Sequence, residues 1–245
     1  MGKIFKKYIA LTLTLSFFLV LPCVAKAEQY RFVTGFLPPW SMSTDPEYPG
    51  SFVEIAREID RRLGKQTKIE VYPWARALEL AQEGRNIIIF PLGRTAEREN
   101  HFTWIEVIKP MEMVFVSLKS KVHSFEEARE FKRVLVHKGA PPDHQLEESN
   151  FKNLAKIPSL TSAIPRMLAH DRADAWYTPK DMAHWMWKLN PEMDVPYFSE
   201  PYSNVDLTFA GSPTLSPVIV ERVRRILGDL KREKYLEKVI ERYKR

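Results

Sequence analysis

An arginine that follows a run of large apolar residues is the feature most able to do chemistry. The run Ile87 to Phe90 is typical of a strand buried on both faces, and Arg98 stands in the loop after it. A guanidinium fixed there can offer two parallel N–H groups to a carboxylate. Trp74 and Arg76 follow the end of another expected strand. The layout predicts a cleft that captures a small anionic or zwitterionic solute.

The arginines also have a purely structural interpretation. Arg98 stands between Glu97 and Glu99 and could form a surface ion pair, although its place after a strand favours a ligand. Both interpretations stay open for Arg94. Arg76 is in the first turn of its expected helix, where a cation is unfavourable for the helix dipole. That position favours a functional role.

Several aromatic residues stand where they could line a cleft. Trp40 and Trp74 lie where a loop meets a regular element rather than on a periodic apolar face, which favours cleft walls over core. Trp176 and Tyr177 are successive residues of one expected strand and therefore face opposite sides. We expect Tyr177 to be the one that reaches the cleft.

Strands alternate with helices along the first half, which predicts parallel strands joined by helices. The expected helix from Ser51 to Gly64 has apolar residues at helical spacing and a capping box of Ser51 and Glu54. The next helix starts at Pro73 and ends at Gly84. The expected strands are Tyr30 to Phe36, Lys68 to Tyr72, Asn86 to Leu92 and the long segment Phe102 to Leu118.

The second half repeats this alternation. Ser124 and Glu127 form another capping box, and Pro165 must lie in the first turn of the helix expected over Ser159 to His170. Pro217 to Arg245 is an amphipathic helical stretch whose acids and bases are interleaved, as on a solvated face. The other expected elements are the strands Val134 to Val136, Ala173 to Tyr177 and Val205 to Ala210, and the helices Asp143 to Ser149 and Asp181 to Leu189.

Residues 1–27 have the pattern of a signal peptide. A start with three lysines precedes the apolar run Ile9 to Leu21, and Ala25-Lys26-Ala27 matches a cleavage site. The run is shorter than the roughly 20 residues that span a bilayer; a retained N-terminal anchor is the alternative. We expect an exported, soluble, periplasmic protein.

Removal of this segment changes the composition of the mature chain. The remaining 218 residues contain no cysteine, so no disulfide framework exists. The segment carries four lysines and no acid, so the formal charge falls from +6 to +2, which removes the main argument for nucleic-acid binding. The histidines show no metal-ligand spacing, and no nucleophile elbow, phosphate loop or dinucleotide motif occurs. We expect no metal and no cofactor.

Six short segments follow one another from Tyr30 to the C-terminus: Gly35-Phe36-Leu37-Pro38-Pro39-Trp40, the helix Phe52 to Gly64, Pro73-Trp74, Thr95-Ala96-Glu97-Arg98, Arg172-Ala173-Asp174-Ala175 and Ser199-Glu200-Pro201-Tyr202. Their order and spacing resemble the family 3 extracellular solute-binding proteins, the amino-acid-binding type of periplasmic binding protein. The resemblance implies a two-lobed α/β fold of the type II periplasmic binding proteins. Each lobe would be a mixed sheet flanked by helices, with two hinge crossings and the ligand enclosed between the lobes.

The resemblance also implies domain boundaries and a hinge motion. Lobe 1 would be discontinuous, comprising residues 28–113 plus 207–245, and lobe 2 would comprise 114–206. The ligand would stabilise the closed form through the contacts made only there.

On lobe 1, the resemblance implies most of a ligand site. In the family, the arginine of the T-x-E-R motif binds the α-carboxylate of the ligand, and here this arginine is Arg98. Aromatic residues sandwich the ligand, which points to the loop from Leu37 to Trp40 and to Trp74. The assisting positions just before the motif are Pro91 and Gly93.

On lobe 2, the resemblance is incomplete. The glycine-bearing loop before its first helix matches Gly139. The family commonly places an aspartate for the α-ammonium five residues after the aspartate of the R-x-D-A strand, and here that position is Pro179, with Thr178 and Asp181 as neighbours. An amino acid, another carboxylate and a modified amine all stay open as ligands.

We therefore expect a monomeric, non-enzymatic receptor for a small polar carboxylate-bearing solute, which it delivers to an ABC-type permease. A periplasmic enzyme on the same fold, such as a dehydratase of a cyclic carboxylic acid, is one alternative. It would need a general acid or base, for which Asp181 and His137 are the candidates. A ligand-sensing partner of a membrane receptor is the other.

Overall fold

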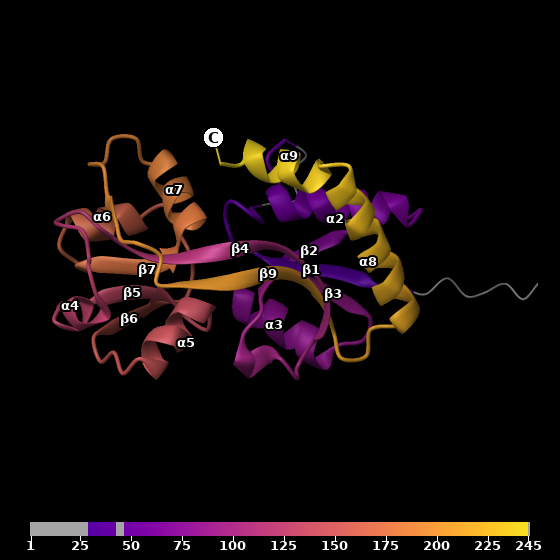
Figure 1. Cartoon of the computed structure of the whole chain (residues 1–245), viewed down its shortest axis with the longest axis horizontal. Coiled ribbons are helices and arrows are strands. Elements are labelled where there is room, and N and C mark those ends of the chain that lie inside the picture. Colours follow the sequence, from indigo (N-terminus) through magenta and orange to yellow (C-terminus); the bar gives the residue numbers. More distant parts are fainter. Residues whose placement is uncertain (1–28, 43–46, 245) are drawn as a thin grey trace, which may run out of the picture.

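Nine strands form one mixed sheet in the part of the chain that this computed structural model describes, residues 29–42 and 47–244. The strand order is β2-β1-β3-β9-β4-β7-β5-β6, and β8 pairs with β4. Separate groups of helices cover the two ends of the sheet, so the molecule has two lobes (Figure 1). The two-lobed α/β architecture predicted from the sequence is confirmed.

The first lobe is built on short parallel strands. β1 pairs in parallel with both β2 and β3, as expected of strands joined by helices. β3 is buried over its whole length, which explains its unbroken apolar run. The elements of this lobe are β1 (Arg31–Gly35), α2 (Ser51–Arg62), β2 (Ile69–Tyr72), α3 (Trp74–Glu83), β3 (Ile87–Gly93), the 3-10 turn η1 (Ala96–Arg98), α8 (Pro217–Arg232) and α9 (Tyr235–Arg242).

The second lobe repeats this arrangement with different strands. β5 lies between β6 and β7 and is parallel to both. The elements are α4 (Phe125–Arg129), β5 (Val134–His137), α5 (Pro141–Glu148), β6 (Leu154–Ile157), α6 (Ile164–Ala169), β7 (Ala175–Pro179), α7 (Lys180–Lys188) and β8 (Tyr197–Phe198).

Two long strands, β4 (Thr103–Ser117) and β9 (Ser203–Gly211), join the lobes (Figure 1). They pair antiparallel from Thr103 opposite Gly211 to Met113 opposite Ser203. β9 also pairs with β3 of the first lobe, and β4 continues alongside β7 of the second. The chain therefore crosses between the lobes along these two strands.

Aromatic clusters fill the interior of both lobes. In the first lobe, Phe209 stacks on Phe52 and Phe90, with ring centroids 5.6 and 5.0 Å apart. In the second lobe, Phe115 lies 4.6 Å from Tyr177 between ring centroids. Each lobe thus has its own packed aromatic centre.

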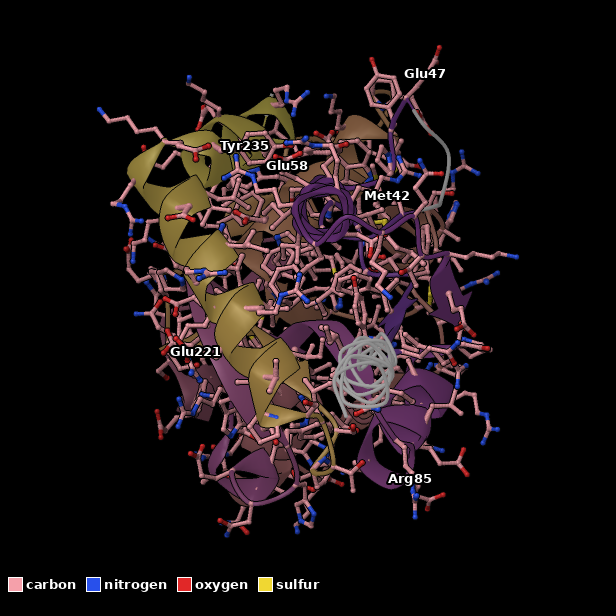
Figure 2. The ribbon with its side chains drawn as sticks, turned by 90° about the vertical axis from the view of Figure 1, so that its right-hand side faces the viewer. Met42, Glu47, Glu58, Arg85, Glu221 and Tyr235 are labelled. Atoms are coloured by element: carbon pink, nitrogen blue, oxygen red, sulfur yellow. The ribbon has the colours of Figure 1, made fainter. Side chains whose placement is uncertain are left out.

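The C-terminal helices α8 and α9 cover one face of the first lobe. Figure 2 shows Tyr235 of α9 beside Glu58 of α2, where these two helices pack together. Tyr243 donates a hydrogen bond to Glu54 of α2 over 2.6 Å. The chain turns at Lys234, which has a φ of 56°, so the single helical stretch predicted from Pro217 onward is divided into two helices.

The capping box predicted at Ser51 and Glu54 is wrong. Ser51 is buried in the first turn of α2, and Gly50 is the N-cap, with a φ of 104°. A Cβ on Gly50 would lie 2.5 Å from the carbonyl oxygen of Trp40. The chain must approach Trp40 closely before it enters α2, and glycine permits this. The box predicted at Ser124 is present: its Oγ accepts the backbone N–H of Glu127 over 3.1 Å.

The helix predicted over Ser159 to His170 is also too long. It starts only at Ile164, which places Pro165 in its first turn, where a proline is tolerated. Before it, Leu154–Ile157 forms β6, a strand that no sequence pattern predicts. β6 pairs in register with β5 at the edge of the sheet, so its ladder bonds come from the tertiary fold.

Across the described residues, no helix is both long enough and apolar enough to cross a membrane. The predicted signal peptide, residues 1–27, lies outside the described residues.

Candidate functional site

A small apolar pocket lies between the two lobes. Its volume is about 40 Å³, which leaves room for only a few water molecules. Its lining comes from the ends of β3 and β7, the loops after β1 and β5, the first turns of α3 and α7, and the joining strands. The residues that line it are Leu37, Trp40, Trp74, Pro91, Gly93, Met111, His137, Ala140, Pro141, Pro142, Pro179, Met182 and Leu207.

The loop after β1 brings the predicted residues Leu37 and Trp40 to this pocket. The Leu37 N–H donates to the Ser41 carbonyl over 2.7 Å, and the Trp40 N–H donates to the Leu37 carbonyl over 3.0 Å. These bonds fold the loop into a tight turn, and both side chains are buried. An indole and an aliphatic chain held in this way form a fixed apolar wall.

Trp74 forms the adjoining wall at the start of α3. Its ring lies against Gly35, where a Cβ would come within 3.0 Å of Cε3. The side chain is only 7% exposed, and its Nε1–H has no hydrogen-bond partner among the described residues. A buried donor without a partner is costly. The indole N–H of Trp74 is thus a buried donor that the described residues leave unsatisfied.

Pro91 and Gly93, also predicted site residues, lie at the end of β3. The pairing of β3 with β9 shifts register between Ile89 and Leu92, so a bulge brings this strand end to the pocket. A Cβ on Gly93 would lie 3.0 Å from Cγ of Pro141 in the second lobe. The two lobes are therefore in contact at this glycine.

Arg98 lies beside the pocket rather than in its lining. Its side chain is 5% exposed; Nη1 donates to the Gly93 carbonyl over 3.2 Å and Nη2 to the Gly139 carbonyl over 3.0 Å. No ion pair joins it to an acidic side chain in the described part of the chain. Burial lowers the pKa of Arg98 to about 10, against the opposing effect of Glu97, so the guanidinium stays charged at neutral pH.

The loop after β5 forms the opposite wall. Gly139 has a φ of 70°, and its N–H donates to Oδ2 of Asp143 over 2.9 Å. Oδ1 of Asp143 lies 2.9 Å from Nζ of Lys156. This network holds the Gly139 carbonyl toward Arg98.

Five of the ten predicted site residues, Arg98 and Gly139 among them, lie outside the lining of the pocket. Arg76 is exposed and forms an ion pair with Glu79 over 2.7 Å. Tyr177 is buried in the second lobe, where its hydroxyl donates to Gln145 over 2.8 Å. Thr178 is buried but lies outside the lining. Arg94, whose role the sequence leaves open, pairs with Glu99 at the surface.

Several lining residues were not predicted. Met111 and Leu207 come from the joining strands, and Met182 comes from the first turn of α7. None of them belongs to a motif, because each is simply one apolar residue of a buried element. The sequence does contain one signal for this side of the pocket, the pair Pro141-Pro142 directly after the glycine loop. Prolines are frequent in the first turn of a helix, so this pair marks the point where the loop ends.

The two residues considered for acid–base chemistry lie in different places. His137 lines the pocket, and burial lowers its pKa, with a hydrogen bond to the backbone of Pro158 opposing the shift. Asp181 forms an ion pair with Lys109 and lines a separate groove between α7 and α9. The described residues contain no group of three or more His, Cys, Asp or Glu side chains that could hold a metal ion.

Comparison with solved structures shows the same fold in proteins of different roles. A histidine kinase sensor domain with similarity to periplasmic binding proteins matches with a TM-score of 0.78 and 17% identity, over 88% of this chain and 96% of that one. The ancestral amino acid-binding protein AncCDT-1, a precursor of cyclohexadienyl dehydratase, matches with a TM-score of 0.75 and 18% identity, over 88% and 95%.

A third structure, the substrate-binding protein of an amino acid ABC transporter, matches with a TM-score of 0.73 and 17% identity, over 88% of this chain and 99% of that one. A search of curated protein sequences finds no match. The sequence model of the bacterial extracellular solute-binding proteins, family 3, matches residues 32–245. The chain belongs to this family of solute-binding proteins.

Proposed function

We propose that the protein is a periplasmic, monomeric receptor without enzymatic activity. It captures a small solute that carries a carboxylate, and it delivers this solute to an ABC-type permease. The family of the chain supports the binding role, and the likeness to the substrate-binding protein of an amino acid ABC transporter supports the transport role.

The observation that carries this proposal is the buried guanidinium of Arg98. A buried charge is normally paired with a charge of opposite sign. Arg98 instead donates to two neutral carbonyls, those of Gly93 and Gly139. A carboxylate beside the pocket would supply the missing negative charge, and the unpartnered N–H of Trp74 would supply a second donor.

The division into lobes fits capture by closure. We propose that residues 28–113 plus 207–245 form lobe 1 and that 114–206 form lobe 2. The change in pairing of β4, from β9 to β7 near Met113, supports this boundary. Because the pocket is small in this arrangement, a solute would enter while the lobes are apart and would be enclosed when they close.

A thermal-shift screen of the purified protein tests the proposal. Each carboxylic acid is compared with its own primary amide, which has the same shape and no charge. A ligand at 100 times its Kd adds about 2.7 kcal/mol to the free energy of unfolding, which for a chain of this size raises Tm by roughly 5 to 10 °C. We expect this shift with an acid and not with its amide.

The Arg98→Met variant should lose the shift, because it keeps an unbranched apolar stem and removes the charged guanidinium. Arg76→Met is the matched control, since Arg76 lies at the surface outside the pocket. An equal shift in Arg98→Met and the wild type would contradict the role of Arg98. Turnover of the bound acid would show an enzyme instead of a receptor.

A further inference from the structure

We propose that the preferred ligand carries a carboxylate on an apolar body and has no amino group. This inference rests on the proposed function and narrows the class of solute. It comes from the described residues that line and adjoin the pocket, which offer hydrogen-bond donors to an anion, whereas the lining offers no negative charge to an ammonium.

The described lining of the pocket contains no acidic side chain. Its one titratable side chain is His137, which is buried and, because its pKa is lowered, neutral at physiological pH. A neutral imidazole carries no charge that could offset an ammonium group. The remaining lining residues are glycine or apolar.

Among the described residues, four acidic side chains of neighbouring elements lie outside the pocket lining and beside basic side chains. Asp181 pairs with Lys109 and faces another groove. Asp143 accepts the Gly139 N–H and pairs with Lys156. Glu97 lies 3.5 Å from Nδ1 of His144, and Glu112 lies 3.3 Å from Nζ of Lys180.

Two backbone carbonyls beside the pocket already accept charged donors. Those of Gly93 and Gly139 both accept N–H groups from Arg98, and the positive charge of this guanidinium disfavours an ammonium group next to them. The groups left to a ligand are the charged donors of Arg98 and the indole N–H of Trp74. This set matches a carboxylate, which only accepts hydrogen bonds.

An amino acid would therefore bury its ammonium without a partner. Removal of a charged group from water without a compensating charge is strongly unfavourable. We expect an acid without the amino group to bind at least about tenfold more tightly than the amino acid of the same side chain.

Isothermal titration of matched pairs tests this expectation. The pairs are propanoate and L-alanine, 4-methylpentanoate and L-leucine, and 3-phenylpropanoate and L-phenylalanine, which cover three sizes of apolar body. We expect at least one of the acids to bind, to bind more tightly than its amino partner, and to lose affinity in Arg98→Met. An amino acid that binds as tightly as its partner, and in an Arg98-dependent manner, would overturn this inference and leave the proposed function intact. If no member of any pair binds, or if the affinity is the same in Arg98→Met as in the wild type, both proposals are rejected.

A second variant tests whether the lack of an acidic side chain in the pocket lining causes the preference for ligands without an amino group. Pro179 lines the pocket and is the N-cap of α7, a position that favours aspartate and asparagine equally. Pro179→Asp should move the preference toward the amino acid by at least about tenfold, whereas Pro179→Asn, the uncharged control, should not. An equal preference in these two variants would contradict the inference.

Discussion

Nη2 of Arg98 donates a hydrogen bond to the backbone carbonyl of Gly139 over 3.0 Å, and this bond crosses from one lobe to the other. Nearby, the side chains of Glu97 and His144 lie 3.5 Å apart across the same boundary. The residue proposed to bind the carboxylate therefore also links the two lobes. Two of the five N–H groups of Arg98 make the bonds to Gly93 and Gly139, so a ligand can accept another while adding contacts of its own to both lobes, and binding and closure are coupled.

The contact at Gly93 predicts that a methyl group added to this residue opposes closure of the two lobes. A Cβ there would lie 3.0 Å from Pro141 of the other lobe and 3.2 Å from Val205. We expect Gly93→Ala to weaken ligand binding about tenfold and to change the Tm of the free protein little, because the cost falls mainly on the closed arrangement. Titration calorimetry and thermal unfolding of the same sample measure both quantities.

Gly228→Ala is the control for this variant. Its Cβ would meet only Arg232, at 3.6 Å, on the surface of α8. Alanine is the better helix former, so this substitution should not lower Tm and should leave affinity unchanged. If Gly93→Ala bound ligand as tightly as Gly228→Ala, the lobes would not close against Gly93.

The backbone conformation of Gly139 gives a second prediction. Its φ of 70° is unfavourable for residues with a Cβ, although no atom lies within 4 Å of the Cβ position. Gly139→Ala should therefore cost about 1 to 2 kcal/mol of stability through the backbone alone. Because relaxation of this strain would turn the carbonyl away from Arg98, affinity should fall as well.

Gly64 provides the matched control, since its φ is 71° and its Cβ position is equally open. Gly64→Ala should lower the free energy of unfolding by a similar amount, measured by urea denaturation, and should leave affinity unchanged. Equal affinities in the two variants would mean that the Gly139 carbonyl has no part in binding.

The sequence predicts the first-lobe side of the pocket better than the second. Trp40 and Trp74 follow strand ends, and Pro91 and Gly93 lie at the end of β3; parallel strands deliver their carboxyl ends to one edge. Arg76 follows the same strand end as Trp74 but misses the pocket, because helical residues two apart do not face the same way. Its proximity in sequence was misleading for that reason.

The second-lobe side depends on packing that no local pattern reveals. Tyr177 and Pro179 are two residues apart on β7 and share a face of the sheet, yet only Pro179 reaches the pocket. Tyr177 lies deeper in the lobe, where it hydrogen bonds to Gln145 of α5. Tertiary packing decides how far a helix covers a strand. The sequence therefore predicts on which face of the sheet Tyr177 lies, but not how deeply its side chain is buried.

The lowered pKa of the Glu58 carboxylate predicts how the free energy of unfolding depends on pH. Bonds to Arg61 and Arg62, each 2.7 Å long, lower the pKa of Glu58 to about 2 from an ordinary value of 4.5. A lowered pKa stabilises the folded state above about pH 4.5, and this contribution disappears as the pH falls toward 2.

Glu58→Gln should therefore be less stable than the wild type at pH 7, by about 1 kcal/mol or less because Arg61 is largely exposed. The difference should shrink as the pH falls from 4.5 toward 2. Urea denaturation of both proteins at several pH values measures it. A difference that stayed constant over this range would contradict the assignment of the pH dependence to Glu58.

The unpartnered N–H of Trp74 predicts separate effects on binding and stability. Trp176 is also buried with an unpartnered Nε1–H, but it lies outside the pocket lining. Trp74→Phe and Trp176→Phe both remove such a donor, so their effects on the free energy of unfolding should be similar. Only Trp74→Phe should weaken binding of a carboxylate, by about 5- to 10-fold for one lost hydrogen bond. Urea denaturation and titration calorimetry on both variants give the comparison, and equal affinities would show that Trp74 contributes shape alone.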